Sequence, residues 1–259
     1  MVLMPKTDIN GIKLNYEVTG NGEPVILLTG FAGSIAFWNS MLPLLPDYKV
    51  ITMDNRGAGM TEYKGQFDTD DLADDVIALM DHLGIFKAHL LGWSMGSTIA
   101  HRIVLRYPER ISTLTLVSPY SRRPARSSYI MNAAIRAVRE GADFDVFSII
   151  LNAFCFGEST FTSKEKKNSK LKLPAPMSIE GIADQMKVVD AYDGRAQIRD
   201  IPFPALVIHG TEDVMVPPWI GEIIAENIRG SKYVEIPGVG HIVPPATYIN
   251  MFREHISRK

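Results

Sequence analysis

Residues 90–97 read Leu90-Leu-Gly92-Trp-Ser94-Met-Gly96-Ser97, a short apolar run that passes directly into the pattern Gly-x-Ser-x-Gly. The apolar run predicts a buried strand, and the spacing of apolar residues over 97–107 predicts a helix. Glycine has no side chain to collide where the backbone turns sharply, so Gly92 and Gly96 favour a tight strand-to-helix turn with Ser94 at its tip. The start of a helix also presents backbone N–H groups to an incipient anion. This stretch therefore predicts a serine placed for nucleophilic chemistry.

Short apolar runs bounded by Gly, Pro or Asp recur on both sides of this stretch. Uninterrupted apolarity is typical of strands that are covered on both faces, as in a parallel sheet. Asn10-Gly11, between two alternating runs, predicts a β-hairpin over residues 7–18. Helical patterns such as 72–83 separate the strands, so the sequence predicts an α/β fold. The expected buried strands are 25–28, 50–53, 88–91, 114–117, 205–208 and 233–236.

The alternation of strands and helices stops between Pro119 and about Gly194. Three helical patterns follow one another there, at 129–140, 143–156 and 178–192. We therefore expect a core made of residues 1–118 and 195–259, interrupted by a helical insertion, residues 119–194. Within the insertion, the charged and aperiodic stretch 164–172 predicts an exposed loop rather than a binding patch.

Length and composition exclude several classes of protein. The chain has 259 residues, of which 22% are charged, and its net charge of −2 gives no basic field for nucleic acid. Its single cysteine, Cys155, allows no intramolecular disulfide and no cysteine metal cluster. No apolar stretch reaches the ~18 residues of a membrane span, and the first residues lack the apolar centre of a signal peptide. We expect a cytoplasmic monomer or homodimer that acts on a small molecule, without a nucleic-acid or membrane partner.

A serine hydroxyl is a weak nucleophile and needs a base, usually a histidine that a carboxylate holds in place. His241 lies in a glycine-rich loop after the last apolar run, and Asp213 follows the run before it, with Glu212 beside it. Loops at strand ends are where catalytic groups are commonly placed. The other histidines are expected elsewhere: His82, His101 and His255 on the surface, and His89 and His209 as hydrogen-bonded structural residues inside strands.

An acidic run, Asp68 to Asp75, lies at the start of the helix predicted at 72–83. Carboxylates in a first helical turn are stabilised by the positive end of the helix dipole. We therefore interpret the run as a solvated helix face rather than a metal site.

With Ser94, Asp213 and His241 in this order, the chain resembles the α/β-hydrolase superfamily over nearly its whole length. Residues 27–34 resemble the oxyanion loop of that family, and residues 53–61 resemble its Asp-x-Arg-Gly-x-Gly-x-Ser turn. The resemblance implies a mostly parallel eight-stranded sheet flanked by helices. It also implies that the helical insertion follows the sixth strand and caps the active site.

The resemblance further implies roles for individual residues. The backbone N–H groups of Phe31 and Met95 would form an oxyanion hole, whereas Asp54 and Arg56 would be structural. No metal and no organic cofactor is implied. A serine nucleophile disfavours the haloalkane dehalogenase and epoxide hydrolase branches, which the resemblance associates with an aspartate at this point.

The expected reaction is acyl transfer to water, and the leading hypothesis is a carboxylesterase that acts on small or medium esters. An enol-lactonase, a carbon–carbon bond hydrolase or an aminopeptidase of the same fold remains open, with a small ester or lactone as the simplest substrate class. A hydrolase-like receptor, which keeps the three residues but only binds its ligand, also remains open.

Two features of the insertion bear on specificity. Arg122, Arg123 and Arg126 are either surface residues or receive a substrate carboxylate, as in enol-lactone hydrolases, which the chain also resembles. The apolar face of 143–156 is expected to roof Ser94 in part, with Phe147 and Phe154 setting the preferred acyl length. Other aromatic residues expected either in the core or along an acyl pocket are Phe31, Phe37, Trp38, Trp93 and Trp219.

Overall fold

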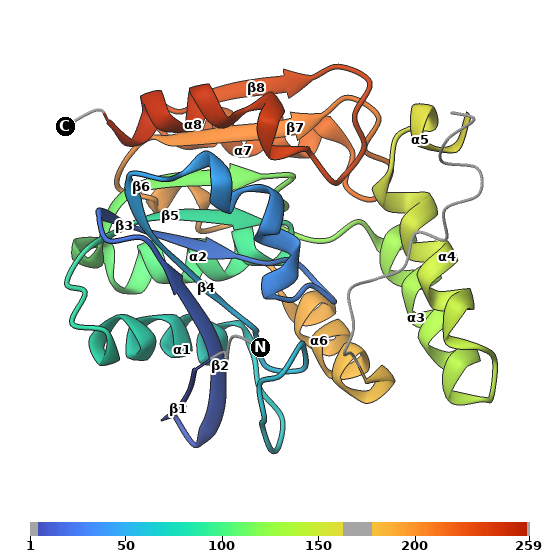
Figure 1. Ribbon diagram of the computed structural model, residues 1–259. Helices are drawn as coiled ribbons and strands as arrows, with labels where there is room; N and C mark the ends of the chain where they lie inside the picture. Colours follow the sequence, from blue (N-terminus) through green and yellow to red (C-terminus); the bar gives the residue numbers. More distant parts are fainter. Residues whose placement is uncertain (1–4, 163–177, 258–259) are drawn as a thin grey trace.

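The structure is a computed structural model, and it describes residues 5–162 and 178–257. It contains an eight-stranded sheet in the order β1-β2-β4-β3-β5-β6-β7-β8, flanked by helices (Figure 1). The strands are β1 (Lys6–Ile9), β2 (Ile12–Thr19), β3 (Glu23–Leu28), β4 (Tyr48–Met53), β5 (Ala88–Trp93), β6 (Ile111–Val117), β7 (Ala205–Gly210) and β8 (Lys232–Ile236). The helices are α1 (Thr69–His82), α2 (Met95–Arg106), α3 (Ala125–Arg139), α4 (Phe144–Cys155), α5 (Glu158–Thr162), α6 (Ile179–Ala191), α7 (Pro218–Asn227) and α8 (Ile249–Ile256).

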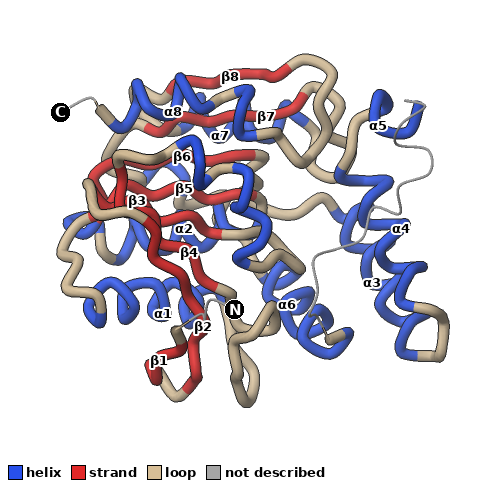
Figure 2. Tube along the Cα trace, in the orientation of Figure 1, coloured by secondary structure: helices blue, strands red, loops and turns tan. Residues whose placement is uncertain are grey.

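The predicted fold class is confirmed. β1 and β2 form the expected hairpin, in which Asn10 and Gly11 adopt φ values of 45° and 74° as a tight hairpin turn requires. β2 pairs antiparallel with β4, and every later pair from β4 through β8 is parallel. The carboxyl ends of the parallel strands therefore share one edge of the sheet, where loops from distant parts of the sequence meet (Figure 2).

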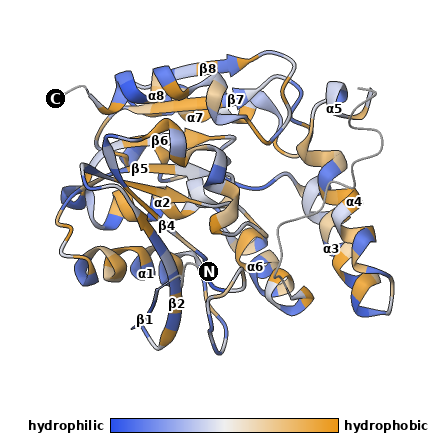
Figure 3. Cartoon of the chain, in the orientation of Figure 1, coloured by the Kyte–Doolittle hydropathy of each residue, from blue (hydrophilic) through white to orange (hydrophobic). Residues whose placement is uncertain are grey.

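Alternate side chains of the central strands enter two separate cores. Leu90 of β5 packs into a core with α1 and α2, whereas Leu91 and Trp93 pack on the other face with Trp38 and with Phe252 of α8. The strands at the centre of the sheet are hydrophobic in Figure 3, as burial on both faces demands. This two-sided burial fixes the register of β5 and hence the position of the residue that follows it.

Helices α3 to α6 lie between β6 and β7 in the sequence. In Figure 1, α3, α4 and α5 lie beyond the carboxyl ends of the parallel strands. α3 begins at Ala125, four residues before the expected start at 129, and packs against both α4 and α6. The loop expected at 164–172 lies outside the described residues. Among the residues that are described, no helix is long and apolar enough to cross a membrane.

Two expectations about polar side chains are wrong. Asp75 is not solvated: it is fully buried and accepts hydrogen bonds from Arg56, with the Nε to Oδ2 distance at 2.7 Å. This bond to Asp75 raises the pKa of Arg56 above its ordinary value. His101 is not on the surface either, because Tyr192, at the end of α6, covers it and bonds to its Nδ1. Burial lowers the pKa of His101 to about 4.

The remaining histidines outside the candidate site lie nearly as expected. His82 is exposed and His89 is buried, with its Nδ1 2.9 Å from Thr113 Oγ1. His255 is half-buried rather than fully on the surface, because α8 packs its Nε2 3.0 Å from the backbone oxygen of Leu114. In the described part of the chain, no group of three His, Cys, Asp or Glu side chains is placed to hold a metal ion.

Candidate active site

The turn from β5 into α2 places Ser94 in a strained conformation, with φ at 53° and ψ at −118°. A non-glycine residue at positive φ costs about 1–3 kcal/mol, so the surrounding packing must hold it there. A side chain on Gly92 would meet the backbone oxygen of Gly96 at 2.3 Å, and one on Gly96 would meet that of Leu28 at 2.2 Å. The two glycines are therefore required by the close approach of β3, β5 and α2.

The structure brings together the three residues that the sequence singled out. The Oγ atom of Ser94 lies 2.8 Å from His241 Nε2, and His241 Nδ1 lies 2.7 Å from Asp213 Oδ2. They come from loops after β5, β8 and β7, which end at the same edge of the sheet. All three are buried, so water competes little with these hydrogen bonds.

The carboxylate of Asp213 has hydrogen-bond partners other than His241. Its Oδ1 accepts a 2.8 Å hydrogen bond from the backbone N–H of Val216, and its Oδ2 lies 3.0 Å from Nε2 of His209. Burial alone would raise the pKa of Asp213, but the charge of His241 and the hydrogen bonds from His209 and His241 outweigh it and lower that pKa. Asp213 therefore carries negative charge against the imidazole of His241.

His209 is a residue whose place in the site was missed from the sequence. It was expected to be a structural residue within a strand, and it is indeed fully buried in β7. Its Nε2 also lies 2.8 Å from the backbone oxygen of Val216, so this nitrogen carries the proton and can donate toward Asp213.

Glu212, the carboxylate next to Asp213 in the sequence, is exposed. It accepts a hydrogen bond from the backbone N–H of Glu158, away from His241.

The loop that carries His241 is tied to the sheet through its backbone. The His241 oxygen accepts hydrogen bonds from Trp93 Nε1 at 3.0 Å and from Ser118 Oγ at 2.8 Å. The N–H of the next residue, Ile242, donates to the backbone oxygen of Cys155 at the end of α4. The position of the imidazole is thus set by β5, β6 and the insertion together.

The residues implied as an oxyanion hole lie next to the serine. Neither the N–H of Phe31 nor that of Met95 donates to another of the described residues, so both are free to bind an oxygen. Met95 is the first residue of α2, where the helix dipole favours an anion. A side chain on Gly30 would meet Ser94 Cβ at 2.9 Å, which places this loop directly against the serine.

Gln185, on α6, fixes the loop that contains Phe31. Its Oε1 accepts a 2.9 Å hydrogen bond from the N–H of Ala32, and its Nε2 donates to the backbone oxygen of Arg56 at 2.8 Å. Gln185 is fully buried, and Ala32 has the unusual φ of 56°. No sequence motif signalled this contact, because it joins residues 153 positions apart.

Ser94 and His241 line a small cavity of about 120 Å³, which we call the inner cavity. α4 contributes to it, but not through the residues expected: Leu151, Asn152 and Cys155 line it, whereas Phe147 and Phe154 do not. Phe147 is fully buried and packs its ring edge against Phe31, 6.2 Å between ring centroids. The other residues that line the inner cavity are Phe31, Ala32, Gly33, Phe37, Trp93, Arg123, Phe156, Met215 and Ile242.

The three arginines before α3 and in its first turn differ in their surroundings. Arg122 and Arg126 are exposed, as surface residues would be. Arg123 is 8% exposed and lines the inner cavity with Ser94. Burial lowers the pKa of Arg123 from its ordinary value, although an arginine remains protonated in proteins.

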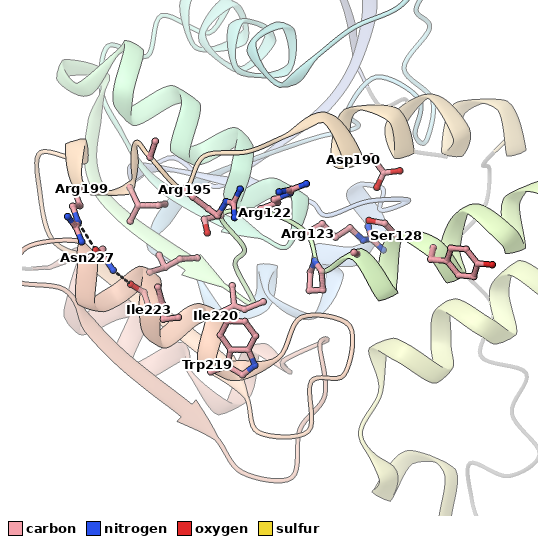
Figure 4. Close-up of a pocket in the computed structure, with 17 residues that line it drawn as sticks. Arg122, Arg123, Ser128, Asp190, Arg195, Arg199, Trp219, Ile220, Ile223 and Asn227 are labelled. Atoms are coloured by element: carbon pink, nitrogen blue, oxygen red, sulfur yellow. Dashed lines mark hydrogen bonds between the residues drawn. The ribbon is translucent and has the colours of Figure 1, made fainter.

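A larger cavity of about 990 Å³, the outer cavity, lies between the start of α3, the residues after α6 and α7. Figure 4 shows Arg122, Arg195 and Arg199 along one side of it and the apolar residues Trp219, Ile220 and Ile223 along the other. Trp219 was expected in a core or an acyl pocket; it is instead 57% exposed and contributes to this second cavity.

Comparison with known proteins places this arrangement in a family. The family described as the alpha/beta hydrolase fold matches residues 23–245, which include every residue of the candidate site. The chain belongs to that family. The α/β-hydrolase fold explains why a serine after β5, an aspartate after β7 and a histidine after β8 converge at one edge of the sheet.

Individual members of the family carry different names. The enol-lactonase of Burkholderia xenovorans LB400 has a solved structure with a TM-score of 0.88 and 25% identity, covering 98% of this chain and 100% of that one. A thermophilic esterase of Thermogutta terrifontis, solved with malate bound, has a TM-score of 0.82 and 28% identity, covering 96% and 95%. A Mycobacterium tuberculosis protein provisionally named as a non-heme bromoperoxidase is 28% identical over 241 residues, 89% of this chain and 91% of that protein.

Proposed function

We propose that this α/β hydrolase cleaves carboxylic esters, with Ser94 as nucleophile, His241 as general base and Asp213 as the carboxylate that orients the imidazole. The observation that carries the proposal is the continuous series of hydrogen bonds from Asp213 through His241 to Ser94, which ends at the inner cavity. The negative charge of Asp213 supports this role, because it stabilises the imidazolium that forms when His241 takes a proton.

In the proposed reaction, Ser94 Oγ bonds to the ester carbonyl carbon while its proton passes to Nε2 of His241. The oxygen that becomes negative accepts hydrogen bonds from the N–H groups of Phe31 and Met95. The alcohol then leaves with the proton from His241, and an acyl-enzyme remains. Water attacks this ester, gives a proton to His241, and releases the carboxylic acid and free Ser94. The steps use side chains, backbone N–H groups and water alone.

In this proposal the core and the insertion have different roles. The core, residues 1–118 and 195–259, supplies all five groups that act on the ester, and the insertion, residues 119–194, caps the inner cavity. Support comes from Leu151 and Cys155, which line the cavity from α4, and from Gln185, which holds the loop of Phe31. Acyl specificity would then depend on the insertion.

A lactone is the second candidate substrate. A lactone is a cyclic ester, so the same steps would open it, with the alcohol remaining attached to the acyl-enzyme until water releases the product. The similarity to the Burkholderia enol-lactonase over 98% of the chain favours this candidate.

A panel of p-nitrophenyl esters with acyl chains of two to ten carbons tests the proposal. We expect many turnovers per active site, with Ser94→Ala as the blank for contaminating esterase. A single stoichiometric burst without turnover would instead support a hydrolase-like receptor, and no reaction at all would contradict ester cleavage. Bromide oxidation by hydrogen peroxide is measured in parallel, because one relative carries a bromoperoxidase name.

A further inference from the structure

Arg123 is a buried cation whose hydrogen-bonding capacity is largely unused. Its Nη2 lies 3.2 Å from the sulfur of Met215, and its guanidinium lies 5.4 Å from the ring centroid of Phe31. Its Nε is buried and has no hydrogen-bond partner. Within residues 5–162 and 178–257, no carboxylate forms an ion pair with it.

A buried charge of this kind is costly unless something compensates it. An ion loses its hydration when it is removed from water, and a buried charge without a compensating partner is strongly destabilising. A thioether sulfur is a weak acceptor, and an aromatic face attracts a cation only modestly. Met215 and Phe31 therefore stabilise Arg123 only in part, and a carboxylate beside it would stabilise it much more.

The location of Arg123 indicates where such a carboxylate would come from. Arg123 lines the inner cavity together with Ser94 and His241, and it lies over the ring of Phe31, whose N–H belongs to the proposed oxyanion hole. A substrate whose carbonyl carbon meets Ser94 places the rest of its acyl group in this cavity. The cavity is small, so a short acyl chain would bring a terminal carboxyl group toward Arg123.

We propose that Arg123 binds a carboxylate at the far end of the acyl group, so that the preferred substrates are short half-esters of dicarboxylic acids or lactones that carry a carboxylate. This inference rests on the proposed ester hydrolysis and adds the substrate class to it. In this role Arg123 is a specificity-determining residue. Arginine suits the role because its planar fork of N–H donors matches the two oxygens of a carboxylate.

The outer cavity is the competing location for an anion, because Arg123 alone among the described residues lines both cavities. The other arginines of the outer cavity already have partners: Arg195 forms an ion pair with Asp193 at 2.6 Å, and Arg199 Nε donates to Asn227 at 2.7 Å (Figure 4). Arg122 lies 3.8 Å from the same Asp193. Arg123, by contrast, has no ion pair or hydrogen bond to a carboxylate among the described residues, although the charge of Asp190 acts on it from the outer cavity and partly offsets its burial. Arg123 is therefore the arginine of the outer cavity with the most to gain from a bound carboxylate.

The experiment compares two esters of equal length. Monoethyl glutarate carries a carboxylate where ethyl pentanoate carries a methyl group, and ester cleavage is followed by pH-stat. We expect wild type to prefer the half-ester in kcat/KM. Arg123→Gln should lower the ratio of the two kcat/KM values by between about tenfold and about a hundredfold, as expected for a lost hydrogen bond to a charged group. Arg123→Lys should recover part of the ratio, since it keeps the charge without the fork.

Two control variants separate the alternatives. Arg126→Gln removes an exposed arginine near the same segment, and Arg195→Gln removes a cation of the outer cavity; both should leave the ratio unchanged. Loss of the ratio in Arg195→Gln would assign the anion to the outer cavity and overturn the inference. An equal loss on both esters in Arg123→Gln, or no preference in wild type, would also overturn it, because Arg123 would then act through packing alone.

A binding measurement keeps this test independent of turnover. Titration calorimetry of free glutarate should detect binding to wild type and at least tenfold weaker binding to Arg123→Gln. If wild type cleaved neither ester but bound glutarate through Arg123, the proposed hydrolysis would fail while the carboxylate site stood. If wild type cleaved ethyl pentanoate but neither bound glutarate nor preferred the half-ester, the proposed hydrolysis would stand and the carboxylate site would fail.

Discussion

The indole Nε1 of Trp93 donates a 3.0 Å hydrogen bond to the backbone oxygen of His241. Trp93, next to the proposed nucleophile Ser94, thus holds the loop that carries the proposed base His241. Ser118 donates to the same oxygen from the end of β6. Small displacements of catalytic groups reduce rates strongly, since reacting atoms must lie within about 3–3.5 Å of one another. The 2.8 Å separation of Ser94 Oγ and His241 Nε2 therefore depends on these backbone contacts.

Ser118→Ala tests this dependence, because Ser118 is buried but does not line the inner cavity. Loss of one hydrogen bond of about 1 kcal/mol should lower kcat for p-nitrophenyl acetate about fivefold and leave KM unchanged. Thr115→Val is the matched control on β6, because the Thr115 hydroxyl is buried without a partner. An equal loss of kcat in both variants would show that packing of β6, and not the position of His241, is responsible.

Asp213→Asn should lower kcat by about 10⁴-fold with little change in KM, because an amide in place of Oδ2 favours the wrong tautomer of His241. Glu212→Gln should remain fully active, because the Glu212 carboxylate bonds to the backbone of Glu158 instead. Steady-state kinetics on both variants decide the matter. If Glu212→Gln lost activity and Asp213→Asn kept it, the assignment of the acid would be reversed.

Leu151→Ala should shift the preferred acyl chain toward longer esters, because Leu151 lines the inner cavity. Each additional methylene that the enlarged cavity accepts contributes up to ~0.8 kcal/mol, or about fourfold in kcat/KM. Phe147→Ala is the comparison: it should lower the free energy of unfolding by about 3–5 kcal/mol but keep the chain-length profile, because Phe147 packs beside the cavity without lining it. A change in acyl chain-length preference in Phe147→Ala but not in Leu151→Ala would contradict these different roles of the two residues.

Acid should destabilise the protein through His101. Its pKa is about 4 in the folded protein against an ordinary 6.5, because burial disfavours the charged form. Between these values the unfolded chain binds a proton that the folded chain does not, so the free energy of unfolding falls as the pH falls from 6.5 to 4, by on the order of 3 kcal/mol. Urea unfolding at several pH values should show that the free energy of unfolding depends less on pH in His101→Gln than in wild type.

His82→Gln supplies the control for that measurement, because it makes the same substitution at an exposed position. Some dependence on pH will remain in His101→Gln between pH 6.5 and 4, because burial also lowers the pKa of His89. The lowered pKa of Asp213 acts in the same direction, but below the ordinary aspartate value of 3.8. If the free energy of unfolding depended on pH in His101→Gln as it does in wild type, His101 would not be the group that destabilises the protein in acid.

Much of the fold and of the candidate site could be predicted because the relevant signals are local. The hairpin at Asn10-Gly11 depends on two residues that tolerate positive φ. Ser94, Asp213 and His241 each follow a predicted strand, and parallel strands end at one edge of the sheet, so their order in the chain was sufficient to bring them together.

The contacts that could not be predicted join segments far apart in the sequence. His101 lies on the polar side of its helix by pattern, and only the position of Tyr192 shows that this side is covered. Asp75 belongs to an acidic run, yet its partner is Arg56 in another loop. Gln185 matters because it holds the N–H of Ala32, 153 positions away, and Arg123 matters because it lines the inner cavity. Neither relationship produces a pattern in the sequence.

The central claim is that Ser94 is the nucleophile, and the rate of ester cleavage by Ser94→Ala tests it most directly. Alanine removes one oxygen from a tip position that lines a cavity, so the thermal midpoint should be close to that of wild type. The same ester is measured with wild type, Ser94→Ala, His241→Ala and the double variant. The account predicts a loss of about 10⁴-fold or more in each single variant, with little further loss in the double variant, because members of one catalytic unit are not additive. Turnover by folded Ser94→Ala within tenfold of wild type would contradict the account.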